Sequence, residues 1–126
     1  MNLLLDTHVF LWAVDDNPNL STDAKEAIID GSNIVYVSAA TAWEIAIKRA
    51  IGKLRIPESD YLEELRLHRF TSLSITTEHA LAVEKLPLFH KDPFDRMLIA
   101  QAQAEKLTIV TRDQRLTDYD VRIIET

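Results

Sequence analysis

The 126-residue chain contains no cysteine, and only two of its residues are glycine. The absence of cysteine excludes both disulfide frameworks and metal sites built from thiolates. No apolar run approaches the roughly 18 residues needed to span a bilayer, and the opening residues MNLLLD lack the basic segment of a secretory signal. We therefore expect a soluble, cytoplasmic protein with no membrane contact, in which residues 1–126 form one domain around a single hydrophobic core.

Positive charge is also in short supply. The chain has 14 lysines and arginines against 20 aspartates and glutamates, for a net charge of −6. A protein that binds nucleic acid usually presents a basic surface, so this balance argues against such binding at first sight. The charge balance is compatible with nucleic-acid binding if several of the acids share one cation site. Charge alone leaves the question open.

Short apolar runs alternate with helical patterns along the chain. The apolar runs predict strands at 3–5, 33–38, 71–75, 107–111 and 121–125. The segments between them predict helices at 7–14, 22–30, 39–51, 57–69, 77–86 and 92–106. This alternation is typical of an α/β fold, with a parallel sheet covered by helices on both faces. In such sheets, ligands bind beyond the carboxyl ends of the strands.

Acidic residues stand where that rule places a ligand site. Asp6 directly follows the first predicted strand, and Asp113 follows the fourth. Glu44 lies in the helix that leaves the carboxyl end of the second strand, close to the same edge. Each of the three also has a purely local explanation. Asp6 could cap the following helix, Glu44 could pair with Lys48 four residues later, and Asp113 could belong to a turn.

The stretch KDPFDRMLIAQA, residues 91–102, adds two further aspartates at the start of a predicted helix. Asp92 followed by Pro93 is a strong helix start, with the aspartate at the N-cap and the proline at the first helical position. Asp95 then falls in the first turn, where a carboxylate favours the helix dipole. We interpret Asp92 as a cap, whereas local arguments do not decide the role of Asp95.

Taken together, the acids favour a metal site over separate local roles. Carboxylates that converge on one edge repel each other strongly unless a cation neutralises them. Oxygen ligands suit Mg²⁺ or Mn²⁺. The chemistry that such a site supports is metal-assisted phosphoryl transfer or phosphodiester hydrolysis.

Four motifs, in this order along nearly the whole chain, resemble PIN-domain proteins and, more narrowly, the VapC-type toxins of bacterial toxin–antitoxin pairs: LLLDTH, SAATAWEIAIKRAIGKL, HKDPFDRMLIAQA and LTIVTRD. The resemblance implies a PIN-like three-layer sandwich whose five-stranded parallel sheet has the order 3-2-1-4-5. It also implies a Mg²⁺- or Mn²⁺-dependent endoribonuclease that hydrolyses RNA with a metal-activated water. A cognate antitoxin and a homodimer are the protein partners that the resemblance implies.

The resemblance assigns residues by position. The catalytic and metal-binding acids it implies are Asp6, Glu44, Asp95 and Asp113. The accessory residues it implies are Asp92, Thr7 and Thr111. None of the four acids departs from the family pattern. Loss of one of them would favour the alternative function, a non-catalytic PIN-like binding or scaffold domain.

Contacts to RNA require basic residues. Arg96 and Arg112 are the first candidates because each adjoins a metal-site acid, and Lys48 is a third. Further basic candidates are Arg49, Lys53, Arg55 and Arg115. The histidines are not expected to be ligands, except that the role of His90 stays open. The two tryptophans, Trp12 and Trp43, are expected to pack in the core.

Two other α/β classes fail at particular residues. A receiver domain needs an acidic pair after the first strand and an aspartate after the third. Here Asp6 stands alone, and the third predicted strand is followed by threonines. A phosphatase of the haloacid dehalogenase type needs two aspartates separated by one residue after the first strand, whereas this chain has Asp6-Thr7-His8.

Overall fold

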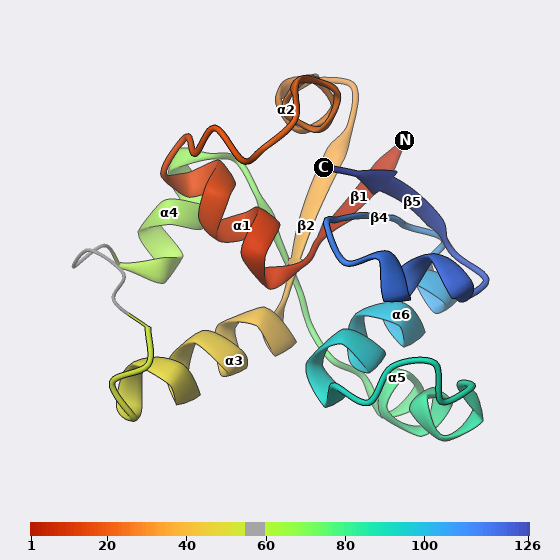
Figure 1. The fold of residues 1–126 in the computed structure, drawn as a ribbon. Coiled ribbons are helices and arrows are strands. Elements are labelled where there is room, and N and C mark those ends of the chain that lie inside the picture. The colour runs from red at the N-terminus through yellow and green to blue at the C-terminus, as the bar shows by residue number, and fades with distance from the viewer. Residues whose placement is uncertain (55–59) are drawn as a thin grey trace.

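The computed structural model describes residues 1–54 and 60–126. Its centre is a five-stranded sheet in the order β3-β2-β1-β4-β5, and every pair of neighbouring strands is parallel. The strands are β1 (Asn2–Leu5), β2 (Ile34–Ser38), β3 (Thr71–Leu73), β4 (Thr108–Thr111) and β5 (Arg122–Glu125). The expected α/β class and strand order are both confirmed (Figure 1).

Helices connect and cover these strands. They are α1 (Thr7–Val14), α2 (Thr22–Ile29), α3 (Ala39–Ala50), α4 (Tyr61–Leu67), α5 (Thr77–Ala82) and α6 (Pro93–Glu105), with short 3-10 turns η1 (Val83–Lys85) and η2 (Gln114–Asp118). No helix within the described ranges is long and apolar enough to cross a membrane.

Three predicted boundaries need correction. The helix expected at 77–86 changes at Val83 into a 3-10 turn, and the strand expected at 71–75 ends at Leu73. The helix expected at 57–69 is observed as Tyr61–Leu67. The beginning of that predicted helix lies outside the described residues.

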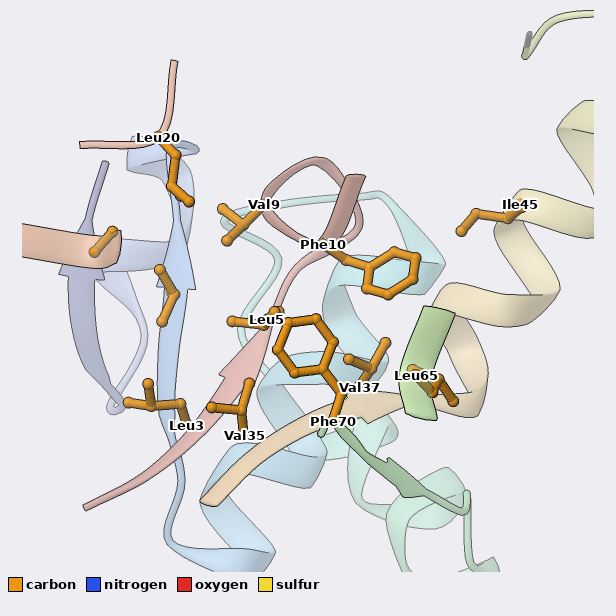
Figure 2. Packing of buried hydrophobic residues seen from close by; sticks show 12 residues of the cluster. Leu3, Leu5, Val9, Phe10, Leu20, Val35, Val37, Ile45, Leu65 and Phe70 are labelled. Carbon is orange, nitrogen blue, oxygen red and sulfur yellow. The ribbon is translucent and has the colours of Figure 1, made fainter. Parts of the chain in front are cut away.

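The alternation of side chains along β1 divides the core into two layers, one on each face of the sheet. Leu3 and Leu5 point to the face covered by α1, α2 and α4, where Phe10 and Phe70 join them (Figure 2). Leu4 points to the opposite face and packs with the apolar side of α6. All three leucines are fully buried, which explains why this strand reads as an uninterrupted apolar run.

Polar side chains fix the starts of the helices. Ser21 accepts a hydrogen bond from the backbone N–H of Ala24 at the start of α2, and Ser38 accepts one from Ala40 at the start of α3. Asp92 accepts two, from Phe94 and Asp95, at the start of α6. These contacts satisfy N–H groups that have no partner inside the helix. The predicted cap at Asp92 is confirmed.

Not every apolar helical residue is in the core. Trp43 is 60% exposed, and its ring meets Phe94 edge-on with the centroids 5.2 Å apart. Leu62 and Leu67 of α4 are 70% and 59% exposed. The expectation that Trp43 packs in the core was therefore wrong, whereas Trp12 is partly buried against the core layer of α1.

Candidate metal centre

The register of the sheet brings the first acid to the strand edge. Leu5 is paired with Val110 of β4, so Asp6 lies beside Thr111 at the carboxyl ends of β1 and β4. The hydroxyl of Thr111 donates a hydrogen bond to Asp6 Oδ2. Asp6 Oδ1 accepts one from the backbone N–H of Val9, 2.8 Å away. Asp6 is thus both the cap of α1 and an acid of the sheet edge.

Burial decides the electrostatics of Asp6. Only 5% of the residue is exposed. Burial raises the pKa of its carboxyl above the ordinary value, although the hydrogen bonds from Thr111 and Val9 oppose this, and the nearby charge of Asp113 adds to the rise. An ionised Asp6 is therefore costly here unless a cation lies close by.

Asp95 reaches the same edge from the start of α6. Its neighbour Asp92 accepts the hydrogen bonds of the helix start, so the Asp95 carboxylate is not needed as a cap. Burial raises the pKa of Asp95 to about 6, and the charges of Asp92 and Asp6 add to the effect. The two aspartates of the DPFD motif thus have separate environments, one capping and one facing the edge.

Asp113 completes the group from the end of β4. It caps η2, and it receives Arg115 in a two-point contact, with Nε to Oδ1 at 3.0 Å and Nη2 to Oδ2 at 2.9 Å. The Arg115 guanidinium lowers the pKa of Asp113, so this acid is ionised more readily than the other two. The predicted turn role and a position at the edge therefore coexist in Asp113.

His90 lies between two of these acids. Its Nε2 is 2.8 Å from Asp95 Oδ2 and 3.1 Å from Asp113 Oδ2. Its Nδ1 accepts a hydrogen bond from the backbone N–H of Asp92 at 3.3 Å, so the hydrogen of a neutral ring lies on Nε2. The imidazole N–H thus occupies the position between two carboxylates that a cation would favour. Sequence reasoning had left this residue open.

The donor set fits a divalent cation. One ligand atom each from His90, Asp95 and Asp113 lies within 4.8 Å of the others. The charge of Asp6 is close enough to raise the pKa of Asp95. Carboxylate oxygens suit Mg²⁺ or Mn²⁺. The His90 imidazole would join them as a ligand only by giving up the hydrogen on Nε2, and Mn²⁺ accepts a nitrogen ligand more readily than Mg²⁺ does. A cation here would relieve repulsion that the protein alone leaves partly uncompensated.

Glu44 stands apart from this group. Its Oε1 accepts a hydrogen bond from Thr7 Oγ1 at 2.6 Å, and its Oε2 pairs with Lys48 Nζ at 2.8 Å. The helical pair expected from the spacing is therefore present. Thr7 follows Asp6 directly, so Glu44 is connected to the edge through its threonine neighbour while both of its own oxygens have partners.

Arg96 corrects one of the RNA-binding expectations. It is 9% exposed. Its guanidinium donates hydrogen bonds to four backbone carbonyls and to the hydroxyl of Tyr119; the carbonyls belong to Val83, Leu86, Pro87 and His90. Arg96 therefore holds the loop that carries His90, and its guanidinium is occupied by these contacts instead of being presented at the surface.

The other basic candidates differ from one another. Arg112 is exposed, and its guanidinium carbon lies 5.6 Å from the centroid of the Trp12 ring. Lys48 is engaged with Glu44, and Arg115 with Asp113. Arg55 lies outside the described residues. Arg112 is thus the basic residue of the edge whose contact is an aromatic face instead of a carboxylate.

The fold and this edge define a class, that of α/β proteins whose parallel strands end in a cluster of carboxylates. Within that class, the model of the PIN domain family matches residues 3–122. The chain therefore belongs to the PIN domain family.

Similarity to two ribonuclease sequences supports this assignment. Ribonuclease VapC22 of Mycobacterium tuberculosis is 32% identical over 120 residues, which cover 93% of this chain and 91% of the relative. Ribonuclease VapC16 of the same organism is 36% identical over 70 residues, covering 51% and 49%. The first of these similarities, which covers most of both chains, places this chain among VapC-like members of the family.

Solved structures share the fold. VapBC2 from Rickettsia felis, bound to a DNA fragment from the promoter, has a TM-score of 0.73 at 16% identity, covering 99% of this chain and 98% of that chain. DNA-bound VapBC from Salmonella typhimurium has a TM-score of 0.65 at 16% identity, with the same coverage. At these identities the likeness establishes the architecture alone.

Proposed function

We propose that this protein is a VapC-like endoribonuclease toxin that depends on Mg²⁺ or Mn²⁺ and acts in the cytoplasm as a single PIN domain. The observation that carries the proposal is the meeting of Asp6, Asp95 and Asp113 at the carboxyl edge of the sheet, with the pKa values of the first two raised. The similarity to ribonucleases VapC22 and VapC16 supports RNA as the substrate.

Asp6, Asp95 and Asp113 are the residues that would hold the metal ion, with His90 beside them and Glu44 completing the acidic set. When bound, such an ion makes a water molecule a better nucleophile and stabilises the charge that develops on the phosphate oxygens. Thr111 keeps one oxygen of Asp6 fixed, and Asp92 leaves Asp95 free for the edge. The family resemblance implies that water attacks the scissile phosphorus in line and that the bond from phosphorus to the 3′ oxygen breaks, which leaves a 3′-hydroxyl on one product and a 5′-phosphate on the other.

Protein partners form a second part of the proposal. Several of the structural neighbours are VapBC complexes, which supports a cognate antitoxin that silences this chain. A homodimer is proposed from the family resemblance. Co-expression with the antitoxin gene, followed by measurement of the complex mass, tests both partners.

The decisive experiment is cleavage of a mixed RNA pool by wild type, Asp6→Ala and Asp95→Ala, with Mg²⁺ or Mn²⁺ and with a chelator. We expect cleavage by the wild type alone and only with metal. Equal cleavage by the variants contradicts the site, and cleavage in chelator contradicts the metal. If the wild type binds RNA without cleaving it under any of these conditions, the non-catalytic alternative is favoured.

A further inference from the structure

A cavity of about 320 Å³ opens beside the acidic edge. Its lining consists of Asp6, His8, Trp12, Arg112 and Asp113. Two of these residues belong to the acidic edge, whereas the other three have played no part in holding a metal. The volume lies at the small end of the range for ligand sites, which is roughly 300–1,000 Å³. The cavity is therefore large enough for one monomer of a polymeric ligand whose neighbouring monomer lies against the acids.

One wall of the cavity is aromatic. His8 and Trp12 lie one turn apart on α1, so their side chains share a face of the helix. Their ring centroids are 6.0 Å apart with the planes tilted by 40°. Trp12 also packs against the core cluster of this face, which restrains its ring. Aromatic rings held in this way are the surfaces on which unpaired nucleobases stack.

The positively charged side chain of Arg112 lies over this aromatic wall. The guanidinium carbon of Arg112 is 5.6 Å from the Trp12 ring centroid, within the range of a cation–π contact. Within residues 1–54 and 60–126, no carboxylate forms a salt bridge with Arg112. Arg115, three residues further on, is paired with Asp113. Arg112 thus keeps its charge available to an anion at the mouth of the cavity.

The cavity has chemical groups that match the parts of a nucleotide. The base of a nucleotide is uncharged and planar, which suits the rings of His8 and Trp12. The phosphate of a nucleotide is an anion, which suits the guanidinium of Arg112. Phosphate contacts of this kind position a nucleic acid, whereas stacking selects bases that are not paired.

We propose that this cavity binds the nucleotide next to the scissile bond of a single-stranded RNA, with the base against Trp12 and His8 and the phosphate on Arg112. The inference rests on the proposed ribonuclease function, and it adds to that function the place where one nucleotide of the substrate binds. A base inside a duplex cannot reach the wall, so the cavity selects unpaired RNA.

Tryptophan fluorescence can report RNA binding at the cavity, because the chain contains two tryptophans and each can be replaced separately. Trp43 is 60% exposed, so Trp43→Phe leaves the core intact and makes Trp12 the only source of indole emission. The titrant is a single-stranded RNA of eight nucleotides in chelator, and its binding is followed in parallel by fluorescence polarisation of a labelled copy. We expect saturable quenching of Trp12. The reverse variant, Trp12→Phe, should show no change in Trp43 emission.

Two further arms separate stacking from charge. An oligonucleotide with abasic sites should bind roughly 10-fold more weakly, since stacking on one aromatic residue is worth about 1–3 kcal/mol per base. Arg112→Gln should weaken binding of the intact and abasic oligonucleotides alike. Arg122→Gln is the matched control, because Arg122 is exposed and pairs with Thr108 at the opposite, amino-terminal edge of the sheet. It removes the same charge and should leave binding unchanged.

The outcomes distinguish this inference from the function on which it rests. RNA that binds while Trp12 emission stays constant overturns the cavity, as does equal quenching by a duplex of the same sequence. If the wild type cleaves RNA but Trp12 is not quenched, the ribonuclease stands and the cavity proposal falls. If Trp12 is quenched with the expected selectivity but no cleavage occurs with metal, the cavity stands and the proposed reaction falls.

Discussion

On one side of the acidic edge, Glu44 has a hydrogen-bond partner for each carboxylate oxygen, namely Thr7 and Lys48. On the other side, Asp95 and Asp113 face each other across the single imidazole of His90. We call these the Glu44 side (Thr7, Glu44 and Lys48) and the Asp95 side (His90, Asp95 and Asp113). The Glu44 side is neutralised by the protein itself.

The Asp95 side is only partly neutralised. Arg115 is exposed, and its guanidinium donates its hydrogen bonds to Asp113, while the pKa of Asp95 stays raised to about 6. The difference teaches that proximity of acids in a fold does not by itself identify the metal ligands. The carboxylates that the protein leaves uncompensated are the ones expected to depend most on a cation.

The largest expected effect follows from replacing the key acid on each side. Asp95→Asn should reduce RNA cleavage by roughly 100-fold or more, since a metal ion supplies several kcal/mol to the transition state and each 1.36 kcal/mol is a factor of ten. Glu44→Gln should cause a clearly smaller loss, because Glu44 is already paired with Lys48. Initial rates at saturating Mn²⁺ measure both. Equal losses would remove the distinction between the two sides.

The largest change in the stability of the protein is expected at Arg96, and it tests whether Arg96 holds the loop that carries His90. Arg96→Met should lower the free energy of unfolding by about 3 kcal/mol, because it leaves buried carbonyls and the Tyr119 hydroxyl without their charged donor. Urea denaturation of the purified variants measures this change. Arg112→Gln is the matched control, since Arg112 is exposed and should alter stability by less than about 0.5 kcal/mol. If Arg96→Met is equally mild, the loop is not held by Arg96.

Replacing the acid on each side by its neutral amide should change the free energy of unfolding in opposite directions. Asp95 has a pKa of about 6 in the folded protein against an ordinary value of 3.8. The folded state therefore holds the proton more tightly, and stability falls as the pH rises from about 4 to 6 and then stays level. In chelator at pH 8, Asp95→Asn should raise the free energy of unfolding by about 1–2 kcal/mol.

The counterpart on the other side is Glu44→Gln, which should lower the free energy of unfolding by about 1 kcal/mol, since it weakens the contacts with Thr7 and Lys48. Urea denaturation at pH 8 and pH 4 compares the two variants. The gain from Asp95→Asn should shrink at pH 4, where the folded wild type is already protonated at this position. A loss of stability in Asp95→Asn at pH 8 would show that Asp95 is compensated without metal.

Local rules predicted where several of these residues lie. Strand ends placed Asp6 and Asp113 at the carboxyl edge, and capping rules identified Asp92 as the cap of α6, whereas the role of Asp95 came from the family resemblance. The strand order came from the family resemblance. Arg96 was misassigned because it adjoins Asp95 in sequence, although adjacent residues on a helix point about 100° apart. A buried arginine could have been suspected from that rule.

His90 and Trp43 show where sequence reasoning stops. The contact of His90 with Asp95 and Asp113 depends on a loop fixed by Arg96 and Tyr119. No periodicity of the local sequence contains that information. Likewise, the exposure of Trp43 depends on which elements cover α3, and its helical spacing is the same whether it is covered or not.

The smallest expected effect concerns Arg115, which partly neutralises the Asp95 side. Its guanidinium lowers the pKa of Asp113, so the pair stabilises the fold above the ordinary value of 3.8, and that stability is lost as the pH falls through the lower folded value. The Arg115 side chain is 65% exposed, so Arg115→Gln should lower the free energy of unfolding only slightly at pH 7, because solvent weakens an exposed pair. At 1 M NaCl the difference should largely vanish, because screening weakens exposed pairs. A larger loss that persists at high salt would mean that the protein neutralises the Asp95 side as firmly as Lys48 and Thr7 neutralise the Glu44 side.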